Sequence, residues 1–348
     1  MASLFCLPRF GPSSHDKGKI MTTSTKESII IVCAADNRYA MPLAVVIRSV
    51  LENVRSDRLC TFFIIDGGIS QKNKNKILKV SDSKQCIITW LKPPDDILDN
   101  MKVSGHIKVA TYYKILIPIL LPDNYCKAIY LDSDLIVQGD LGKLWDINIE
   151  NNYLLAVQDS GIPYVSSYYG LQNYKELGIP LDYKYFNAGV LVLNLEKMRK
   201  QSTSTQVIQY LEDNKQHIRW HDQDGLNAVL AGKWGELEPR WNQLPSIYNN
   251  SSWKDSPFSQ EEFTNALKEP YIIHFASSSK PWNSTVYHPA NDLFFHYLDM
   301  TPWVGWRWTI WRRIWRKIIQ KIQFYKEKYQ GYCGVQKAVR FKKNFSCG

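Results

Sequence analysis

Three short apolar runs near the start of the chain have the pattern of buried β-strands. Residues 28–33 read Ser-Ile-Ile-Ile-Val-Cys, and residues 60–65 and 86–90 are similarly rich in β-branched and aromatic side chains and carry no charge. Runs that are apolar throughout, rather than at alternate positions, are typical of strands buried on both faces of a sheet. We therefore predict strands at 28–33, 60–65 and 86–90, the first of them buried on both faces.

Helical patterns separate these runs. Between residues 41 and 53 apolar side chains recur every three or four positions, and the polar segment 69–80 includes Ser70 where a helix cap would stand. Strands that alternate with helices predict a parallel sheet joined by right-handed crossovers.

The alternation continues along most of the chain. We predict a helix around 110–116 and strands at 127–131, 190–195 and 271–275. No internal repeat or low-complexity linker precedes about residue 285. The pattern predicts one α/β domain at 28–285, with a mostly parallel central sheet.

The remaining segments are a loose leader at 1–27 and a helical tail at 286–348. The leader has a broken apolar run followed by Ser, Thr, His and Lys, which is a poor match to a signal peptide. No run of about 18 uncharged apolar residues occurs, so we expect no membrane-spanning helix. The seven cysteines are scattered without a CxxC pair, which disfavours a disulfide framework or zinc site and fits a reducing compartment.

The positive charge of the chain is concentrated in the tail. The net charge is +10, and residues 303–343 hold 12 of the 43 Lys and Arg but only one of the 33 acids. The rest of the chain is therefore close to neutral. A basic body would indicate nucleic-acid binding; this body does not, and we expect no nucleic-acid partner.

Within the tail, apolar and basic residues take opposite faces of a predicted helix. One face carries Trp311, Ile314, Trp315, Ile318 and Ile322. The other carries Arg312, Arg313, Arg316, Lys317 and Lys321. Such a helix suits the interface of an anionic membrane, which would make the protein cytoplasmic and peripheral on the inner face of the membrane. The alternative is that the helix packs on the domain with its bases in solvent.

Two carboxylates, Asp132 and Asp134, follow the predicted strand 127–131 directly. Ligands of open α/β sheets bind beyond the carboxyl ends of strands. Two acids so close repel each other unless a cation lies between them, and their oxygens suit Mg²⁺ or Mn²⁺. A turn with a helix-capping Asp fits the same spacing equally well.

Two later segments carry further polar groups suited to a metal–phosphate–sugar site. His274 ends a predicted strand and precedes three serines and Lys280; imidazole favours Mn²⁺ over Mg²⁺, and Lys280 with the serine N–H groups could hold a phosphate. Taken alone, a histidine in this position is more often structural than a metal ligand. The segment Asp222-Gln223-Asp224 precedes a helical pattern and is either a capping cluster or a sugar-binding group.

The ordered set of segments resembles glycosyltransferase family 8, whose members are retaining nucleotide-sugar enzymes such as glycogenin and bacterial lipopolysaccharide galactosyl- and glucosyltransferases. The resemblance covers about residues 28 to 285. The segments that carry it are Cys33-Ala34-Ala35-Asp36, Thr111-Tyr112-Tyr113-Lys114, Leu131-Asp132-Ser133-Asp134, Phe186-Asn187-Ala188-Gly189-Val190, Asp222-Gln223-Asp224-Gly225-Leu226-Asn227, and His274-Phe275 through Lys280-Pro281-Trp282.

This resemblance implies a GT-A fold, a Rossmann-like catalytic domain with an Asp-x-Asp motif, at 28–285. It implies a divalent cofactor, with Mn²⁺ preferred, held by Asp132, Asp134 and His274. The donor, a UDP-sugar, would contact Ala34, Ala35, Asp36, Tyr39, Lys114, Asp132, Ser133, Asn187, Asp222, Ser277 and Lys280. Of these, Asp36 would read the base, Tyr39 would lie against it and Lys280 would bind the diphosphate. Asp159 is a candidate contact to the acceptor.

Two residues depart from the family pattern. Lys114 stands where the family usually has Arg, and Lys cannot grip a donor bidentately. Ser277 stands where the family usually has Gly, so a positive φ at that position would be strained. Both departures bear on which sugar is used rather than on the activity.

The resemblance implies transfer of a hexose, glucose or galactose, with retention to a glycan or glycolipid acceptor. Gln223 lies where a nucleophile is expected, but a neutral amide is a feeble nucleophile. We therefore expect front-side transfer with Gln223, Asp222 and Lys114 as the catalytic group. Two other functions compete: a sugar nucleotidyltransferase, which would normally show a Gly-rich loop after the first strand, and a membrane-bound scaffold that binds sugar nucleotides without catalysis.

Overall fold

The computed structural model describes residues 28–55, 57–81, 85–94, 109–284 and 286–312, together with 314, 315, 318 and 321. The predicted leader at 1–27 lies outside the described residues. So do four residues of the predicted tail helix, Arg313, Arg316, Lys317 and Ile322. No helix in the described part of the chain is long and apolar enough to cross a membrane.

The first half of the sheet is built as the apolar runs predict. Strands β1 (Ile29–Ala35), β2 (Cys60–Asp66) and β3 (Cys86–Leu91) are parallel, with Ile29 opposite Cys60 and Cys60 opposite Cys86. Helices α1 (Ala40–Asn53) and α2 (Gln71–Val80) form the crossovers. The predicted cap of α2 is confirmed, since the Ser70 hydroxyl accepts from the Asn73 N–H.

The second half of the sheet contains one reversed strand. Strand β4 (Lys127–Leu131) is parallel to β1, whereas β7 (Phe186–Asn194) lies antiparallel between β4 and β6 (Leu154–Gln158). Strand β8 (Gly235–Glu236) closes the order β3-β2-β1-β4-β7-β6-β8. The predicted mostly parallel sheet is confirmed. The reversal of β7 follows from the loop 159–185, which returns the chain without a crossover helix.

Two predicted elements differ in kind or place. The predicted helix 110–116 is a 3₁₀ helix, η1 (Val109–Leu116), which continues into the short α3 (Ile117–Leu120). The predicted strand 271–275 is β9 (Ile272–His274), which lies outside the main sheet. It pairs antiparallel with β5 (Leu135–Val137), the segment that directly follows the two acids, so that Leu135 faces His274.

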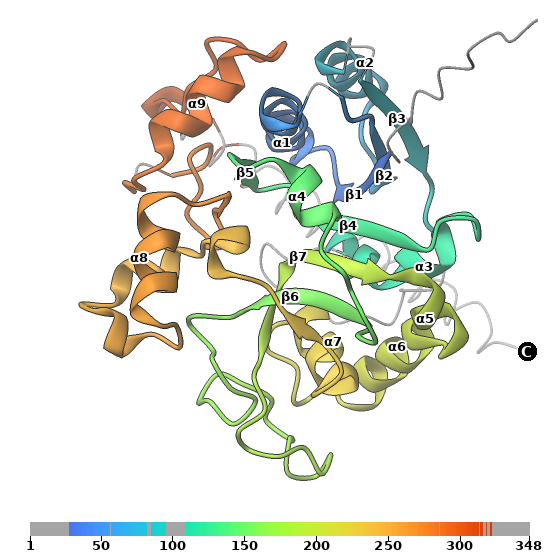
Figure 1. The fold of residues 1–348 in the computed structure, drawn as a ribbon. Helices are drawn as coiled ribbons and strands as arrows, with labels where there is room; N and C mark the ends of the chain where they lie inside the picture. Colours follow the sequence, from blue (N-terminus) through green and yellow to red (C-terminus); the bar gives the residue numbers. More distant parts are fainter. Residues whose placement is uncertain are drawn as a thin grey trace, which may run out of the picture.

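The other helices flank the sheet and the site. They are α4 (Leu141–Trp145), α5 (Leu195–Lys200), α6 (Thr203–Asp213), α7 (Asp222–Leu230), α8 (Gln260–Lys268), α9 (Asn291–Asp299), and the 3₁₀ turns η2 (Pro239–Asn242), η3 (Pro245–Asn249) and η4 (Trp253–Asp255). In Figure 1, α1 and α2 lie on one side of the view and α5, α6 and α7 on the other, with the sheet between them.

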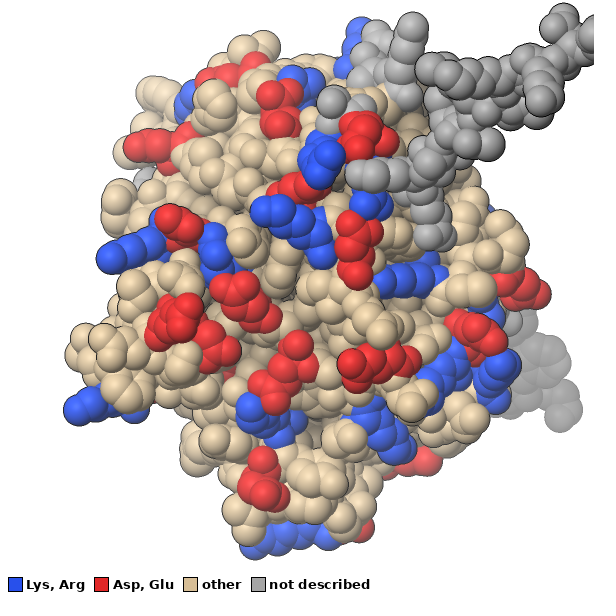
Figure 2. Space-filling model, viewed as in Figure 1, with Lys and Arg blue, Asp and Glu red and all other residues tan. Residues whose placement is uncertain are grey.

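The packed fold continues beyond residue 285. Phe294 and Leu298 of α9 are buried in an apolar cluster with Val45 of α1 and Ile136 of β5. Trp303 also packs on this body, with the Lys76 ammonium 4.6 Å from its ring centre. Figure 2 shows basic and acidic side chains interspersed over one face of the molecule, as expected of a nearly neutral body.

Candidate active site

A cavity of about 910 Å³ opens at the carboxyl ends of β1 and β4. Its walls come from the end of β1, from η1, from the β4–β5 loop, from the start of β7, from the start of α7 and from the segment after β9. All of the site residues predicted from the sequence line it: Ala34, Ala35, Asp36, Tyr39, Lys114, Asp132, Ser133, Asp134, Asp159, Asn187, Asp222, Gln223, His274, Ser277 and Lys280.

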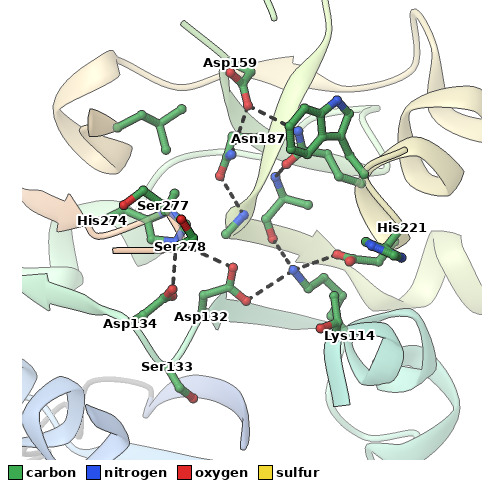
Figure 3. A pocket seen from close by; sticks show the side chains of 18 of the residues that line it. Lys114, Asp132, Ser133, Asp134, Asp159, Asn187, His221, His274, Ser277 and Ser278 are labelled. Carbon is green, nitrogen blue, oxygen red and sulfur yellow. Dashed lines mark hydrogen bonds and ion pairs between the residues drawn. The ribbon is translucent and has the colours of Figure 1, made fainter. Parts of the chain in front are cut away.

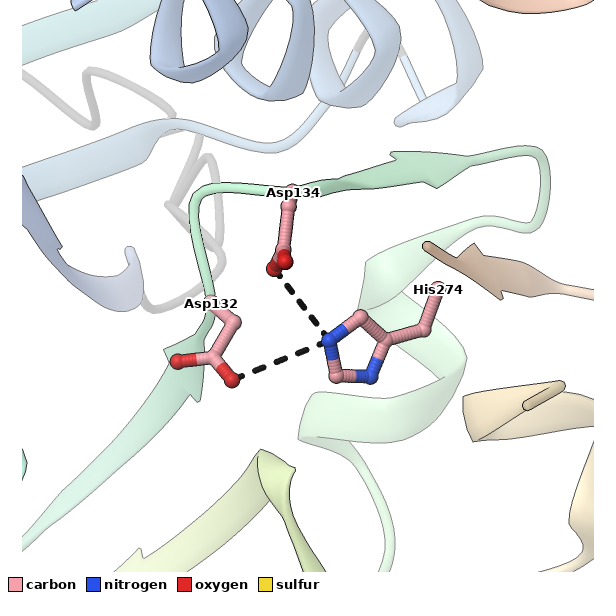
Figure 4. Close-up of side chains that lie close together, drawn as sticks. All are labelled: Asp132, Asp134 and His274. Carbon is pink, nitrogen blue, oxygen red and sulfur yellow. Dashed lines mark hydrogen bonds and ion pairs between the residues drawn. The ribbon is translucent and has the colours of Figure 1, made fainter. Parts of the chain in front are cut away.

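One wall of the cavity carries a group suited to a metal ion. Asp132, Asp134 and His274 each offer a ligand atom, and these atoms all lie within 4.8 Å of one another. Figure 4 shows the two acids on the turn between β4 and β5, with His274 facing them from β9. The His274 Nε2 atom lies 3.2 Å from Asp134 Oδ1 and 3.7 Å from Asp132 Oδ2. Two carboxylates and one imidazole are a donor set that fits Mn²⁺.

A neighbouring amide orients the imidazole. The Asn242 Oδ1 atom lies 3.0 Å from His274 Nδ1, and the Asn242 amide donates to Asn187 Oδ1 at 2.9 Å. Because a carbonyl oxygen only accepts, Nδ1 carries the proton and the Nε2 lone pair is directed at the two acids. Asn242 was not predicted as a site residue, since nothing in its local sequence distinguishes it.

Gly189 leaves the space in which this group assembles. A Cβ atom at Gly189 would lie 2.2 Å from His274 Cε1 and 3.0 Å from Asp132 Oδ2. No real Cβ approaches buried groups so closely, so any larger residue would force the imidazole or the acid away. The glycine of the Asn187-Ala188-Gly189 segment is therefore required by close approach of side chains.

Two buried lysines offset part of the negative charge of the acids. Lys280 donates from Nζ to Asp134 and to the Phe275 carbonyl. Lys114 lies 3.2 Å from Asp132 Oδ1 and 2.8 Å from Asp222 Oδ2, and donates to the Ala188 carbonyl at 3.0 Å. Figure 3 shows Lys114 between these groups. Three carboxylates and two ammonium groups leave the site with a net negative charge, which favours a divalent cation.

Burial and the neighbouring lysines act against each other, and the net shifts in pKa are opposite for Asp222 and Asp134. Burial raises the pKa of Asp222 to about 6, and the attraction of Lys114 offsets this only in part. Burial also opposes ionisation of Asp134, but the Lys280 ammonium holds the pKa of that carboxyl below its usual range. Asp132 additionally accepts a hydrogen bond of 2.6 Å from the Tyr130 hydroxyl, a contact that the sequence did not reveal.

The acidic cluster at the start of α7 divides into two roles. Asp222 and Gln223 line the cavity, whereas the Asp224 side chain is buried behind it. Asp224 Oδ2 accepts from the Arg219 and Trp220 N–H groups, at 2.7 and 2.8 Å. Asp224 thus holds the turn that precedes α7, which has no side-chain cap at its N-terminus, and the other two residues are left for a ligand.

The residue before Asp222 has an unusual backbone. His221 has a φ of 54°, a region that non-glycine residues seldom occupy. The contacts of Asp224 hold this turn, and the His221 imidazole lies 2.9 Å from the Tyr112 hydroxyl. Strained backbone of this kind is typical of functional sites. His221 also lines the cavity, and its place beside the acidic cluster was the only signal that could have found it.

A network of hydrogen bonds across the cavity fixes the orientation of the Gln223 side chain. Its Oε1 accepts from the Ala188 N–H at 3.0 Å, and its amide donates to Asp159 Oδ2 at 3.2 Å. Asn187 donates to the same Asp159 oxygen at 3.0 Å. Figure 3 shows Asp159 and Asn187 across the cavity from Asp132 and Asp134. Asp159 thereby sets the orientation of both amides.

The end of β1 forms another part of the cavity. The Asp36 carboxylate accepts from the Arg38 and Tyr39 N–H groups at 2.8 and 3.2 Å and pairs with the Arg38 guanidinium. Ser133 donates to the Ala34 carbonyl at 2.8 Å, which ties the acidic turn to β1. Arg38 also lines the cavity and was not predicted.

Ser277 does not have the strained backbone that its place in the family pattern suggested. Among the described residues, positive φ values at non-glycine positions occur only at Glu150, Ser202 and His221. The Ser277 N–H donates to the Phe275 carbonyl at 2.8 Å, and its hydroxyl donates to the Ser279 carbonyl at 2.7 Å. A serine is therefore compatible with this turn.

Comparison with known proteins identifies the family. The family model described as glycosyl transferase family 8 matches residues 30–286. The chain belongs to this family. General stress protein A of Bacillus subtilis is 34% identical over 80% of this chain and 95% of its own length. Lipopolysaccharide 1,2-glucosyltransferase of Escherichia coli is 24% identical over 88% of this chain and 86% of its own.

Solved structures agree with this assignment. The galactosyltransferase LgtC, in complex with donor and acceptor sugar analogues, is 25% identical to this chain and superposes with a TM-score of 0.68, over 79% of this chain and 96% of that one. The family and the sheet order together identify this chain as a glycosyltransferase with a GT-A fold.

Proposed function

We propose that this glycosyltransferase moves glucose or galactose from a UDP-sugar, with retention and with the help of Mn²⁺, to a glycan or glycolipid acceptor. The observation that carries the proposal is the convergence of Asp132, Asp134 and His274 on one wall of a cavity that also contains Lys280 and the Asp222–Gln223 pair. Relatives named as glucosyl- and galactosyltransferases support the choice of hexoses.

Different residues around the cavity would bind different parts of the donor. Ala34, Ala35, Asp36 and Tyr39 would hold the uridine at the end of β1. Lys280, whose ammonium is buried beside Asp134, would offset the charge of the diphosphate. Ser133 would contribute by holding the acidic turn against β1.

A divalent cation held by Asp132, Asp134 and His274 would stabilise negative charge on the leaving UDP. The orientation of His274 by Asn242 favours such a role over a purely structural one, because it directs the Nε2 lone pair at the acids.

The sugar would lie near Lys114, Asp222, Asn187 and Gln223. Lys114 and Asp222 form a buried ion pair whose hydrogen-bonding groups suit sugar hydroxyls. The Gln223 amide is held at both ends, by the Ala188 N–H and by Asp159, which suits steadying a sugar and not attacking it. We therefore favour front-side transfer, in which the acceptor hydroxyl enters on the side that UDP leaves. Asp159 would contact the acceptor or position the amides that do.

We further propose that the protein is cytoplasmic and binds the anionic inner face of the membrane through its tail. Residues 310–312, 314, 315, 318 and 321 are helical. Trp311 and Trp315 of this segment are 70% and 63% exposed, and Ile314 and Ile318 are 43% and 41% exposed. Exposure of this face argues against the alternative that it packs on the domain, and tryptophans beside bases suit a bilayer interface.

The test is hydrolysis of UDP-glucose and UDP-galactose by the full chain, with Mn²⁺ and with a chelator. We expect Mn²⁺-dependent release of UDP from at least one of the two donors. Formation of a UDP-sugar from UTP and a sugar 1-phosphate would instead identify a nucleotidyltransferase. Binding of a UDP-sugar without any turnover would identify a scaffold.

A further inference from the structure

Three aromatic side chains form an exposed ridge that begins inside the cavity and extends out of it. Trp220 and Tyr169 line the cavity and are 44% and 53% exposed, while Tyr168 lies beyond it and is 80% exposed. We call these three residues the aromatic ridge. Trp220 precedes His221 and Asp222, so the inner end of the ridge lies beside the proposed sugar site.

The rings of the ridge are placed in a continuous order. The ring centres of Trp220 and Tyr169 are 6.4 Å apart, and those of Tyr169 and Tyr168 are 4.8 Å apart, both in edge-to-face arrangement. The Arg219 guanidinium lies 5.8 Å from the centre of the Tyr168 ring. Large exposed aromatics that are contiguous with a polar cavity are typical of binding surfaces.

The backbone beneath the ridge is firmly held. Trp220 Nε1 donates to the Tyr169 carbonyl at 2.8 Å, and Arg219 donates to the Tyr168 carbonyl at 2.7 Å. These bonds join the loop between β6 and β7 to the start of α7. In Figure 1 that loop projects from the sheet close to α7. A Cβ atom at Gly170 would lie 2.4 Å from the Val165 carbonyl oxygen, so the loop makes a tight turn directly after Tyr169.

The chemistry of the ridge selects its occupant. A pyranose ring has an apolar face of C–H groups and a rim of hydroxyls, and an aromatic side chain offers a rigid apolar surface with a polar tip. The Asp159 and Gln223 polar groups inside the cavity suit the hydroxyls of the reacting sugar, whereas the ridge outside offers mainly flat rings. An extended sugar chain meets both surfaces at once.

We propose that the aromatic ridge is an outer acceptor subsite that stacks on a sugar unit beyond the one that receives the hexose, so that the preferred acceptor has at least two sugars. This inference rests on the proposed function, since it requires a sugar acceptor.

The test compares matched acceptors of one and two sugars. Methyl glucoside and methyl galactoside are compared with maltose, cellobiose and lactose, with UDP-glucose or UDP-galactose as donor. Aromatic tags are avoided because they would themselves stack on the ridge. We expect kcat/KM for the best disaccharide to exceed that of the matching methyl glycoside by about tenfold or more.

Variants of Tyr168 and Tyr169, the outer two residues of the aromatic ridge, then test whether the ridge causes the preference for disaccharides. Tyr168→Ala with Tyr169→Ala should reduce the preference for the disaccharide to about twofold or less, by raising KM for the disaccharide more than KM for the methyl glycoside. The backbone carbonyls of these residues, and not their side chains, accept the bonds from Arg219 and Trp220, so the loop should keep its shape. Tyr168→Phe with Tyr169→Phe retains both rings and should retain the preference.

Tyr287→Ala is the matched control, because Tyr287 is also 80% exposed but does not line the cavity. It should leave the preference intact. The inference is overturned if one- and two-sugar acceptors react equally, if none of them reacts while the donor is hydrolysed, or if the double alanine variant keeps the preference. Absence of donor hydrolysis in the unaltered chain would instead reject the proposed function.

Discussion

At the scale of single residues, the site depends on groups that the sequence pattern did not reveal. Asp132, Asp134 and His274 were predictable because each ends a strand-like run. Their alignment, however, depends on Asn242, on Tyr130 and on the absence of a side chain at Gly189. The Asn242 and Gly189 contacts join residues that are far apart in the sequence, so no local pattern records them. The Tyr130 hydroxyl is only two positions from Asp132, but the spacing of the two residues does not reveal that their side chains meet.

Gly189→Ala tests whether the metal group needs this space. The added Cβ would meet His274 Cε1 at 2.2 Å, so the imidazole must move and we expect Mn²⁺ affinity to fall by about 10- to 100-fold. Isothermal titration with Mn²⁺ measures this directly. Gly161→Ala is the matched control, since a Cβ there meets its neighbours no closer than 3.4 Å and Mn²⁺ affinity should be unchanged. Unaltered affinity in Gly189→Ala would show that the cluster does not hold the metal.

The raised pKa of Asp222 predicts that activity falls at acid pH. Its pKa is raised to about 6, so the carboxylate is ionised and paired with Lys114 above that pH and becomes neutral below it. We expect kcat/KM for donor hydrolysis to fall about tenfold per pH unit below pH 6. Asp222→Asn should lower the plateau and remove this limb, and persistence of the limb in that variant would argue against the assignment.

Protonation of Asp222 should affect the stability of the fold in the direction opposite to its effect on activity. Because the folded pKa of Asp222 lies above the unfolded value, its contribution to the free energy of unfolding is greatest at low pH and is lost as the pH rises through about 6. Denaturant unfolding of the unaltered chain and of Asp222→Asn between pH 4 and pH 8 would separate this effect from loss of activity.

At the scale of elements, the apolar runs predicted the strands well and their arrangement less well. Strands β1, β2 and β4 were confirmed because a run buried on both faces has a distinctive composition, and β3 was confirmed although it lies at the sheet edge and is only half-buried. The reversal of β7 and the pairing of β9 with β5 were not predictable. The direction of a strand is set by the path of the preceding loop, and the partner of a short strand is set by tertiary packing. The 3₁₀ form of η1 likewise was not apparent from its helical spacing.

The tail helix makes a prediction at the same scale. Trp311→Ser with Trp315→Ser should reduce co-flotation of the full chain with phosphatidylserine-containing vesicles by about tenfold, because these exposed rings would insert at the interface. Trp253→Ser is the control, since Trp253 is 37% exposed and lies in η4. Truncation at Trp303 would be less informative, since Trp303 and Trp306 pack on the body. Equal flotation of all three proteins would exclude the tail as the membrane contact.

At the scale of the whole molecule, the sequence predicted the family and the position of the site, because polar residues follow several strands that end at one edge of the sheet. It could not predict which cationic side chains offset the charge of the acids in the site. The structure shows Lys280 beside Asp134, and Lys114 between Asp132 and Asp222. Charged side chains from four distant segments thus form one compact group around the proposed metal site.

The most direct test of that centre is Mn²⁺-dependent hydrolysis of the UDP-sugar by the unaltered chain, Asp132→Ala and Asp134→Ala. We expect a chelator to abolish turnover in the unaltered chain, and each variant to retain no more than about 1% of the Mn²⁺-supported rate. Near-normal turnover of either variant in the presence of chelator would contradict the assignment of these carboxylates as metal ligands.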